Sequence, residues 1–179
     1  IDIRGLKQFR CFNYQVPGDI SSASFFIVLT LLSKNSELII KNICINPSRI
    51  GILHILKKMK ADIKIINPKN YKGELIGDLK IKSTKNFRSI NCPENLNSSA
   101  IDEFLLIFLI AAKSNGISKF KNLGELNKKE SPRLDLAINF LKMINVKVVR
   151  KQNDIKIHGN PKLDLDGNYH IKDFLKDHR

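Results

Sequence analysis

The sequence predicts an α/β fold made of a repeated unit in which helices pack against small sheets. Helical segments, some wholly apolar and some amphipathic, alternate with short strand-like segments along the chain. The order of these segments in the first half recurs in the second half, at the spacing of about 84 residues that separates Arg49 from Arg133. The chain has 179 residues, of which 42% are hydrophobic, and this is enough to form the core of one domain.

The first copy of the unit begins with an apolar helix and ends with a hairpin. We expect helices where apolar residues recur at helical spacing, and strands where short apolar runs lie between turn residues. In chain order, the expected elements are a helix at Ser24–Leu32, a strand at Glu37–Asn42, a turn and helix cap at Asn46-Pro47-Ser48, a helix at Arg49–Met59, and a hairpin of Ala61–Ile66 with Leu79–Ser83.

The second copy repeats this order. Ser131 is expected as the N-cap of its second helix, with Pro132 at the first helical position, where a missing N–H costs nothing. In chain order, the expected elements are a helix at Glu103–Ala112, buried on nearly all sides, a strand at Ile117–Asn122, a helix at Arg133–Ile144, and a hairpin of Val146–Arg150 with Asp154–Ile157.

A third copy would start near Leu163, and the sequence ends at Arg179, where the first helix of that copy would begin. We therefore expect repeated βαβαββ units related by pseudo-threefold symmetry, with the last unit truncated. Residues 1–15 are assigned to the end of a first domain and a crossover segment, and residues 16–179 to a second domain. Because the chain starts at Ile1 without a leader sequence, we expect a fragment of a longer protein.

The composition argues against two classes of function and weakly indicates a compartment. The net charge of +14 suits a nucleic-acid binder, but the lysines are spread through every segment and only 7% of residues are aromatic, so we expect no nucleic-acid partner. The longest apolar run, Phe104–Ala112, is too short to span a bilayer, so we expect no membrane role. Three widely spaced cysteines indicate reduced thiols and a cytoplasmic protein.

Acidic residues precede the first helix of each copy. Asp19 and Asp102 stand before apolar helical runs, and Asp177 stands at the equivalent place in the third copy. Helix N-termini that converge there would create a positive field for an anionic ligand. Asp19 could equally be an ordinary N-cap. Asp102 could complement a helix dipole or, at the edge of an apolar core, act as the base for a substrate hydroxyl.

The segment Glu125–Arg133 places a cation, a carboxylate and an arginine at a helix entrance. Lys129 and Glu130 precede the helix, and Arg133 lies in its first turn. A cation in the first turn opposes the helix dipole, so Arg133 needs a compensating anion, which a bound substrate could supply. The alternative is a surface ion pair of little energetic value.

At these segments the sequence resembles the EPSP synthase family of enolpyruvyl transferases. The resemblance covers essentially the whole chain and is carried by motifs that occur in the family's order. These motifs are Val16 to Phe26, Asn46-Pro47-Ser48-Arg49-Ile50-Gly51, Ile101-Asp102-Glu103, Glu125 to Arg133, and Asp177-His178-Arg179.

The resemblance implies an enzyme of two domains, each with three copies of one folding unit, that close over the substrates. The implied reaction moves the enolpyruvyl group of phosphoenolpyruvate to the 5-hydroxyl of shikimate 3-phosphate and releases phosphate, in the pathway to chorismate and the aromatic amino acids. The resemblance implies no metal or organic cofactor, and the full-length protein is expected to be a monomer. Because catalysis needs groups from both domains, we expect this chain to be inactive alone.

The resemblance also implies roles for individual residues. Asp102 would bind shikimate hydroxyls and act as a base, and Glu130 would take part in proton transfer to the phosphoenolpyruvate methylene. Substrate-binding roles are implied for five more residues: Lys129 at the shikimate 3-phosphate, Arg133 and Arg179 at the phosphoenolpyruvate carboxylate, His178 beside them, and Glu125 at the border of the shikimate site.

Three residues depart from the family pattern: Asn127 stands where Arg is usual, Pro132 where Asp is usual, and Leu105 where Pro often occurs. Three alternatives stay open, and the departures at Asn127 and Pro132 bear on the last of them. The protein could be an enolpyruvyl transferase with another acceptor, a basic RNA-binding module built on the repeat fold that RNA 3′-phosphate cyclases share, or a homologue without catalytic activity.

Overall fold

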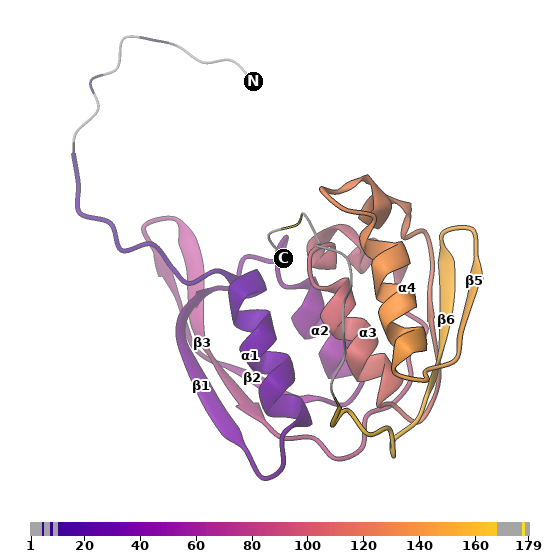
Figure 1. The fold of residues 1–179 in the computed structure, drawn as a ribbon. Helices are drawn as coiled ribbons and strands as arrows, with labels where there is room; N and C mark the ends of the chain where they lie inside the picture. Colours follow the sequence, from indigo (N-terminus) through magenta and orange to yellow (C-terminus); the bar gives the residue numbers. More distant parts are fainter. Residues whose placement is uncertain (1–4, 6–7, 9–10, 168–176, 178–179) are drawn as a thin grey trace.

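The computed structural model describes Gly5, Gln8, residues 11–167 and Asp177. Within these residues, four α-helices lie between two three-stranded antiparallel sheets (Figure 1). Each sheet belongs to one half of the chain, and the helices of both halves share one hydrophobic core. The expected α/β fold is confirmed.

The first copy of the repeat comprises two helices and a sheet. Its elements are α1 (Ile20–Leu32), β1 (Glu37–Cys44), α2 (Gly51–Lys58), β2 (Asp62–Tyr71) and β3 (Glu74–Lys82). The strand order is β1-β3-β2. Ahead of α1, Gly18 forms a parallel bridge to Ile43 of β1, so the leading strand of a βαβαββ unit is reduced here to a single bridge.

The second copy has the same order and topology, which confirms the repeat. Its elements are α3 (Phe104–Ala112), β4 (Gly116–Phe120), α4 (Arg133–Met143), β5 (Val148–Lys151) and β6 (Asp154–Gly159), with strand order β4-β6-β5. Parallel bridges from Arg88 and Asn91 again stand in for the leading strand. Three short 3-10 helices, which the sequence pattern did not reveal, complete this copy: η1 (Glu94–Leu96), η2 (Ser98–Ala100) and η3 (Gly124–Lys128).

The third copy falls mostly outside the described residues. Residues 163–167 form no helix or strand, and of the remainder only Asp177 is described. The symmetry that the structure displays is therefore that of two copies.

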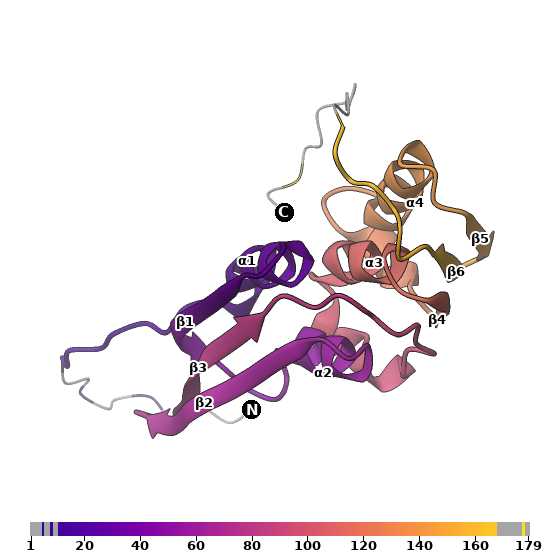
Figure 2. The ribbon, with the colours of Figure 1, turned by 90° about the horizontal axis from the view of Figure 1, so that it is seen from below.

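Helix α3 is the centre of the fold. It packs against α1, α2, α4 and β6, and Figure 2 shows it between α1 and α4. None of its residues is exposed, as expected, and Phe104 and Phe108 form an aromatic cluster with Phe120, with ring centroids 5.1 to 6.0 Å apart. It is only nine residues long, and in the described part of the chain no helix combines the length and the apolar character needed to cross a membrane.

Helix α1 is apolar on both its inner and its outer face. Ile20, Ile27 and Leu31 are buried against the core, whereas the outer face exposes three large side chains, Phe25, Phe26 and Leu29. An apolar surface of this kind is typical of a helix that another part of the protein covers.

The hairpin of β2 and β3 is longer than the sequence predicted. We expected Ile66 as the last residue of its first strand, but the ladder continues to Tyr71, and β3 begins at Glu74 rather than Leu79. A register shift between Ile66 and Lys69 interrupts the alternation of apolar and polar residues that marks a strand. Lys72 and Gly73 both have positive φ and close the hairpin, as a two-residue turn of type I′ requires.

Helix α2 begins two residues later than expected. The backbone N–H and the hydroxyl of Ser48 both donate to Oδ1 of Asn46, at 3.1 and 2.9 Å, so Ser48 closes a turn and caps no helix. The helix starts at Gly51 instead. The later start reflects competition for backbone N–H groups, because the side chain of Asn46 takes the N–H of Ser48 into a turn.

The three cysteines are free thiols, as expected. Burial raises the pKa of the Cys92 thiol to about 11, so it is neutral at physiological pH.

Replacing Gly51 by Ala should destabilise the full-length protein. A Cβ at this position would lie 2.6 Å from the carbonyl carbon of Ser99, in the backbone of η2. We expect a loss of about 1 to 3 kcal/mol from this overpacking, which outweighs the gain of about 1 kcal/mol in helix propensity. Urea unfolding measures the difference, and Gly5→Ala is the control because no atom lies within 4 Å of its Cβ. A more stable Gly51→Ala variant would contradict this packing.

Candidate active site

The buried side chain of Arg133 is the centre of the site. Arg133 is the first residue of α4, and its side chain is only 3% exposed. Its guanidinium forms a bidentate ion pair with Asp177, in which Nε lies 2.8 Å from Oδ2 and Nη2 lies 2.9 Å from Oδ1. Nη1 donates to Oδ1 of Asp102 at 2.9 Å, and Nη2 also donates to Oε2 of Glu130 at 2.9 Å. One cation therefore holds three carboxylates.

The packing of α3 against α4 brings these groups together. Asp102 lies in the turn between η2 and α3, whereas Glu130 lies in the loop between η3 and α4. Because the two helices are in contact and begin at the same end of the molecule, the residues that precede them meet (Figure 1). Lys129, in the same loop as Glu130, places Nζ 3.4 Å from Oδ1 of Asp102.

Electrostatics keep Arg133 charged. The hydrogen bonds that Arg133 donates to Asp177 and then to Asp102 raise the pKa of its guanidinium above its ordinary value, while burial opposes this shift. A buried arginine of this kind is stable only with its carboxylates in place, since an uncompensated buried charge costs several kcal/mol.

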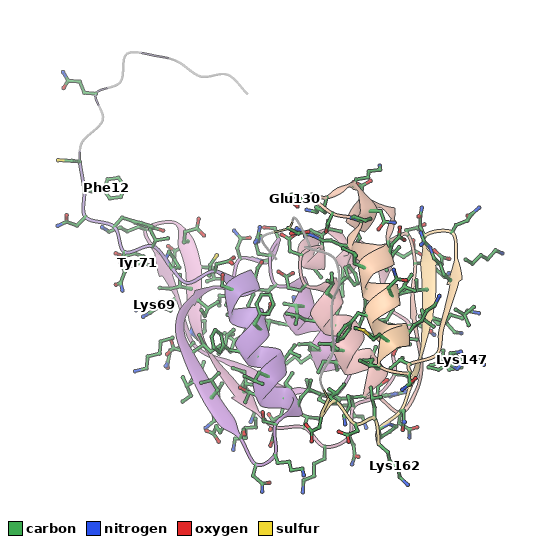
Figure 3. The ribbon with its side chains drawn as sticks, viewed as in Figure 1. Phe12, Lys69, Tyr71, Glu130, Lys147 and Lys162 are labelled. Carbon is green, nitrogen blue, oxygen red and sulfur yellow. The ribbon has the colours of Figure 1, made fainter. Side chains whose placement is uncertain are left out.

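The exposure of the groups increases from Arg133 outward. The Asp177 side chain is 4% exposed, those of Asp102 and Lys129 are partly buried, and that of Glu130 is 50% exposed. Figure 3 shows Glu130 at the end of the molecule where the helices begin. Asp102, Lys129 and Glu130 are thus the members of the cluster that a ligand in solution can reach.

The structure brings together four of the seven residues expected at the site: Asp102, Lys129, Glu130 and Arg133. Glu125 is not joined to them, because its carboxylate pairs with Nζ of Lys128 at 2.7 Å on the surface of η3. The hydrogen bond that Lys128 donates to Glu125 raises the pKa of the Lys128 ammonium group. His178 and Arg179 lie outside the described residues.

Ser131 has a different role from the one expected. The N-cap of α4 is Pro132, and the helix begins at Arg133, so Ser131 is neither the N-cap nor followed by a helical proline. Its hydroxyl instead donates to Oδ2 of Asp177 at 2.6 Å. The sequence marked Asp177 as the residue before a helix and as the first residue of the Asp177-His178-Arg179 motif, but it gave no sign that Asp177 would pair with Arg133.

The first copy contains a more exposed version of the same pair. Arg49 lies 3.5 Å from Asp19, and its Nη2 donates to the hydroxyl of Ser21 at 3.2 Å. Of the two interpretations of Asp19, the structure shows the N-cap: its side chain caps α1. The side chain of Arg49 is 49% exposed, in contrast to buried Arg133.

The alignment of acidic residues between the copies needs one correction. The N-cap of α3 is Glu103, so Glu103 rather than Asp102 occupies the place of Asp19. Glu103 is buried and accepts a hydrogen bond of 2.5 Å from the Ser21 hydroxyl, which ties the two copies together. Asp102 stands one residue earlier and can therefore turn toward Arg133.

Comparison with known proteins gives consistent matches over the whole chain. The model of the family described as EPSP synthase (3-phosphoshikimate 1-carboxyvinyltransferase) matches residues 1–179. A 3-phosphoshikimate 1-carboxyvinyltransferase of Petrotoga mobilis is 41% identical over 90% of this chain and 37% of the relative. That of Geobacillus kaustophilus is 34% identical over 100% of this chain and 41% of the relative.

Solved structures give the same result. The structure of EPSP synthase from Acinetobacter baumannii superposes with a TM-score of 0.79 and 36% identity, over 83% of this chain and 33% of that one. The chain thus spans roughly a third to two fifths of the length of these relatives.

Replacing Arg133 by Met should destabilise the full-length protein strongly. The variant removes the guanidinium that neutralises buried Asp177, and we expect a loss of about 3 to 5 kcal/mol. Arg49→Met is the matched control from the other copy: its ion pair is exposed, so we expect less than about 1 kcal/mol. Urea unfolding of both variants tests this, and equal losses would show that burial does not set the value of the pair.

Proposed function

Because this chain belongs to the EPSP synthase family, we propose that the full-length protein transfers the enolpyruvyl group of phosphoenolpyruvate to the 5-hydroxyl of shikimate 3-phosphate and releases phosphate. The observation that carries the proposal is the cluster around Arg133. It combines two accessible carboxylates, Asp102 and Glu130, with the ammonium group of Lys129. Proton-transfer groups and cations for anionic substrates therefore meet at one point.

The proposed reaction needs two proton-transfer groups. As the 5-hydroxyl oxygen bonds to C2 of phosphoenolpyruvate, the hydroxyl loses a proton and the C3 methylene gains one. When the bond from C2 to the phosphate oxygen breaks, C3 gives up a proton and the double bond returns. We assign the hydroxyl proton to Asp102, which lies deeper in the cluster, and the C3 proton to the more exposed Glu130.

Arg133 would bind the substrate by exchanging the carboxylate of Glu130 for a carboxylate of the substrate. Its bidentate ion pair with Asp177 is buried, whereas its Nη2 also reaches half-exposed Glu130. A substrate carboxylate that takes over this donor would release Glu130 toward the reacting carbon. Arginine suits this role because a planar guanidinium can bind a carboxylate without losing its other hydrogen bonds.

The remaining substrate contacts would come partly from Lys129 and Glu125 and partly from residues that this structure does not describe. Lys129 supplies a partly exposed cation for the phosphate of shikimate 3-phosphate. We assign further contacts to His178 and Arg179 and to the first domain, with Glu125 at the border of the site. Since the substrates would be held between two domains, we propose that this chain alone has no activity.

The outer face of α1 supports the proposed division into domains. We assign residues 1–15 to the end of a first domain and residues 16–179 to a second domain. In the full-length protein, the completed third copy of this domain would cover Phe25, Phe26 and Leu29, as α3 covers the other side of α1. This burial would stabilise the full-length protein through the hydrophobic effect.

Replacing Phe26 by Glu tests this division. If a third copy covers α1, the charge becomes buried and the full-length protein should lose roughly 3 kcal/mol or more of stability, because a buried unpaired charge is costly. Urea unfolding provides the measurement. Unchanged stability would show that this face is open to solvent in the complete protein and would exclude the division.

Replacing Glu130 by Gln tests its role in catalysis. The substitution keeps the size of the side chain but removes the transferable proton, so we expect kcat to fall by about 100-fold or more while KM changes little. Phosphate release with both substrates measures turnover in the full-length protein. Glu94→Gln is the control, because Glu94 is an exposed residue outside the cluster, and this variant should keep full activity.

The outcomes of this experiment separate two conclusions. Unchanged turnover in Glu130→Gln would remove the proton-transfer role of Glu130. A full-length wild-type protein that releases no phosphate with both substrates would overturn the proposed function itself.

A further inference from the structure

The first turn of α4 lacks a helix cap of its own. The N-cap residue is Pro132, whose side chain cannot accept a hydrogen bond. The first N–H groups of any helix have no acceptor within the helix, and a polar side chain at the N-cap usually supplies one. The N–H groups of Leu134 and Asp135 therefore need an acceptor from elsewhere.

Asn127 supplies that acceptor from outside the helix. Its Oδ1 accepts from the backbone N–H of Leu134 at 2.9 Å and from that of Asp135 at 3.3 Å. Its Nδ2 donates to Oδ1 of Asp135 at 3.1 Å. The amide of Asn127 thus acts as acceptor and donor at once, which a carboxylate or a hydrocarbon side chain at this position cannot do.

Asp135, which accepts the hydrogen bond from Asn127, is also held by Arg150. The hydrogen bond from Asn127, followed by that from Arg150 of β5, lowers the pKa of the Asp135 carboxyl. Asp135 therefore stays ionised at physiological pH and remains a strong acceptor. This network links η3, α4 and β5 through three side chains.

These bonds close the loop that carries the reactive residues. Asn127 lies in η3 and its acceptors lie in the first turn of α4, so the loop Lys129–Pro132 is held at both ends. That loop contributes Lys129 and Glu130 to the cluster, while α4 contributes Arg133. Movement of η3 against α4 would change the distance of Lys129 and Glu130 from Arg133.

We propose that Asn127 is a positioning residue, which caps α4 in place of Pro132 and thereby holds Lys129 and Glu130 in register with Arg133. The inference rests on the proposed function, because positioning has a catalytic effect only if the cluster is the active site. A small displacement of reacting groups lowers turnover by about 10- to 100-fold. If the hydrogen bonds of Asn127 only fastened the loop to α4, their loss would lower stability and leave turnover unchanged.

The test compares two asparagines in the full-length protein. Asn127→Ala removes the outside cap. The matched control is Asn97→Ala, because Asn97 is also half-buried and also bridges two segments, through a bond of 2.8 Å to the carbonyl of Lys121. We expect similar losses of thermal stability in both variants, but a fall in kcat of about 10-fold or more only in Asn127→Ala.

A rescue variant tests the mechanism. Pro132→Ser places a good capping hydroxyl at the N-cap without adding charge to the cluster. In the Asn127→Ala background it should restore most of kcat and should return slow hydrogen exchange to the amides of Leu134 and Asp135. The inference would be overturned if Asn127→Ala had the same kcat as the wild type. It would also be overturned if the double variant protected those amides again but kept the low kcat of Asn127→Ala.

Hydrogen exchange also separates this inference from the proposed function. If the wild-type protein lacks enolpyruvyl transfer, the proposed function fails, and with it the catalytic part of the inference. The capping part is then decided by exchange alone: faster exchange of Leu134 and Asp135 in Asn127→Ala supports it, and unchanged exchange overturns it.

Discussion

The buried guanidinium of Arg133 is the constraint on which the rest of the site depends. It must be compensated, and the nearest carboxylates come from three separate parts of the chain: Asp102 before α3, Glu130 before α4, and Asp177 beyond β6. Each of these carboxylates is therefore placed by the same cation. Because the cost of an uncompensated buried charge is large, Arg133 and buried Asp177 depend on each other most strongly, whereas half-exposed Glu130 contributes less.

The repeat shows how one local pattern gives two different structures. In both copies an acidic residue before the first helix pairs with an arginine near the start of the second helix. In the first copy the pair is half-exposed, and solvent screening leaves it little energetic value. In the second copy Ser131 and Asp177 enclose the arginine, and burial makes the pair costly to break.

Two departures from the family pattern acquire a joint explanation. Pro132 removes the capping side chain at the start of α4, and Asn127 provides an acceptor for the N–H groups that this leaves. Neither residue is informative by itself, since a proline is an ordinary residue near a helix start and an asparagine is ordinary in a loop. Together they keep the loop of Lys129 and Glu130 attached to the helix that carries Arg133.

The sequence by itself determined the repeat, the α/β class and most of the elements, because periodicity and turn residues act over short distances. The same patterns found Asp102, Lys129, Glu130 and Arg133. They missed the continuation of the β2–β3 hairpin, where a register shift breaks the alternation, and they misplaced the caps at Ser48 and Ser131. Caps depend on which of several nearby acceptors a backbone N–H meets, and only the tertiary structure decides that. It also decided which of two equivalent arginines is buried, because burial depends on residues distant in the chain, such as Asp177, which pairs with Arg133.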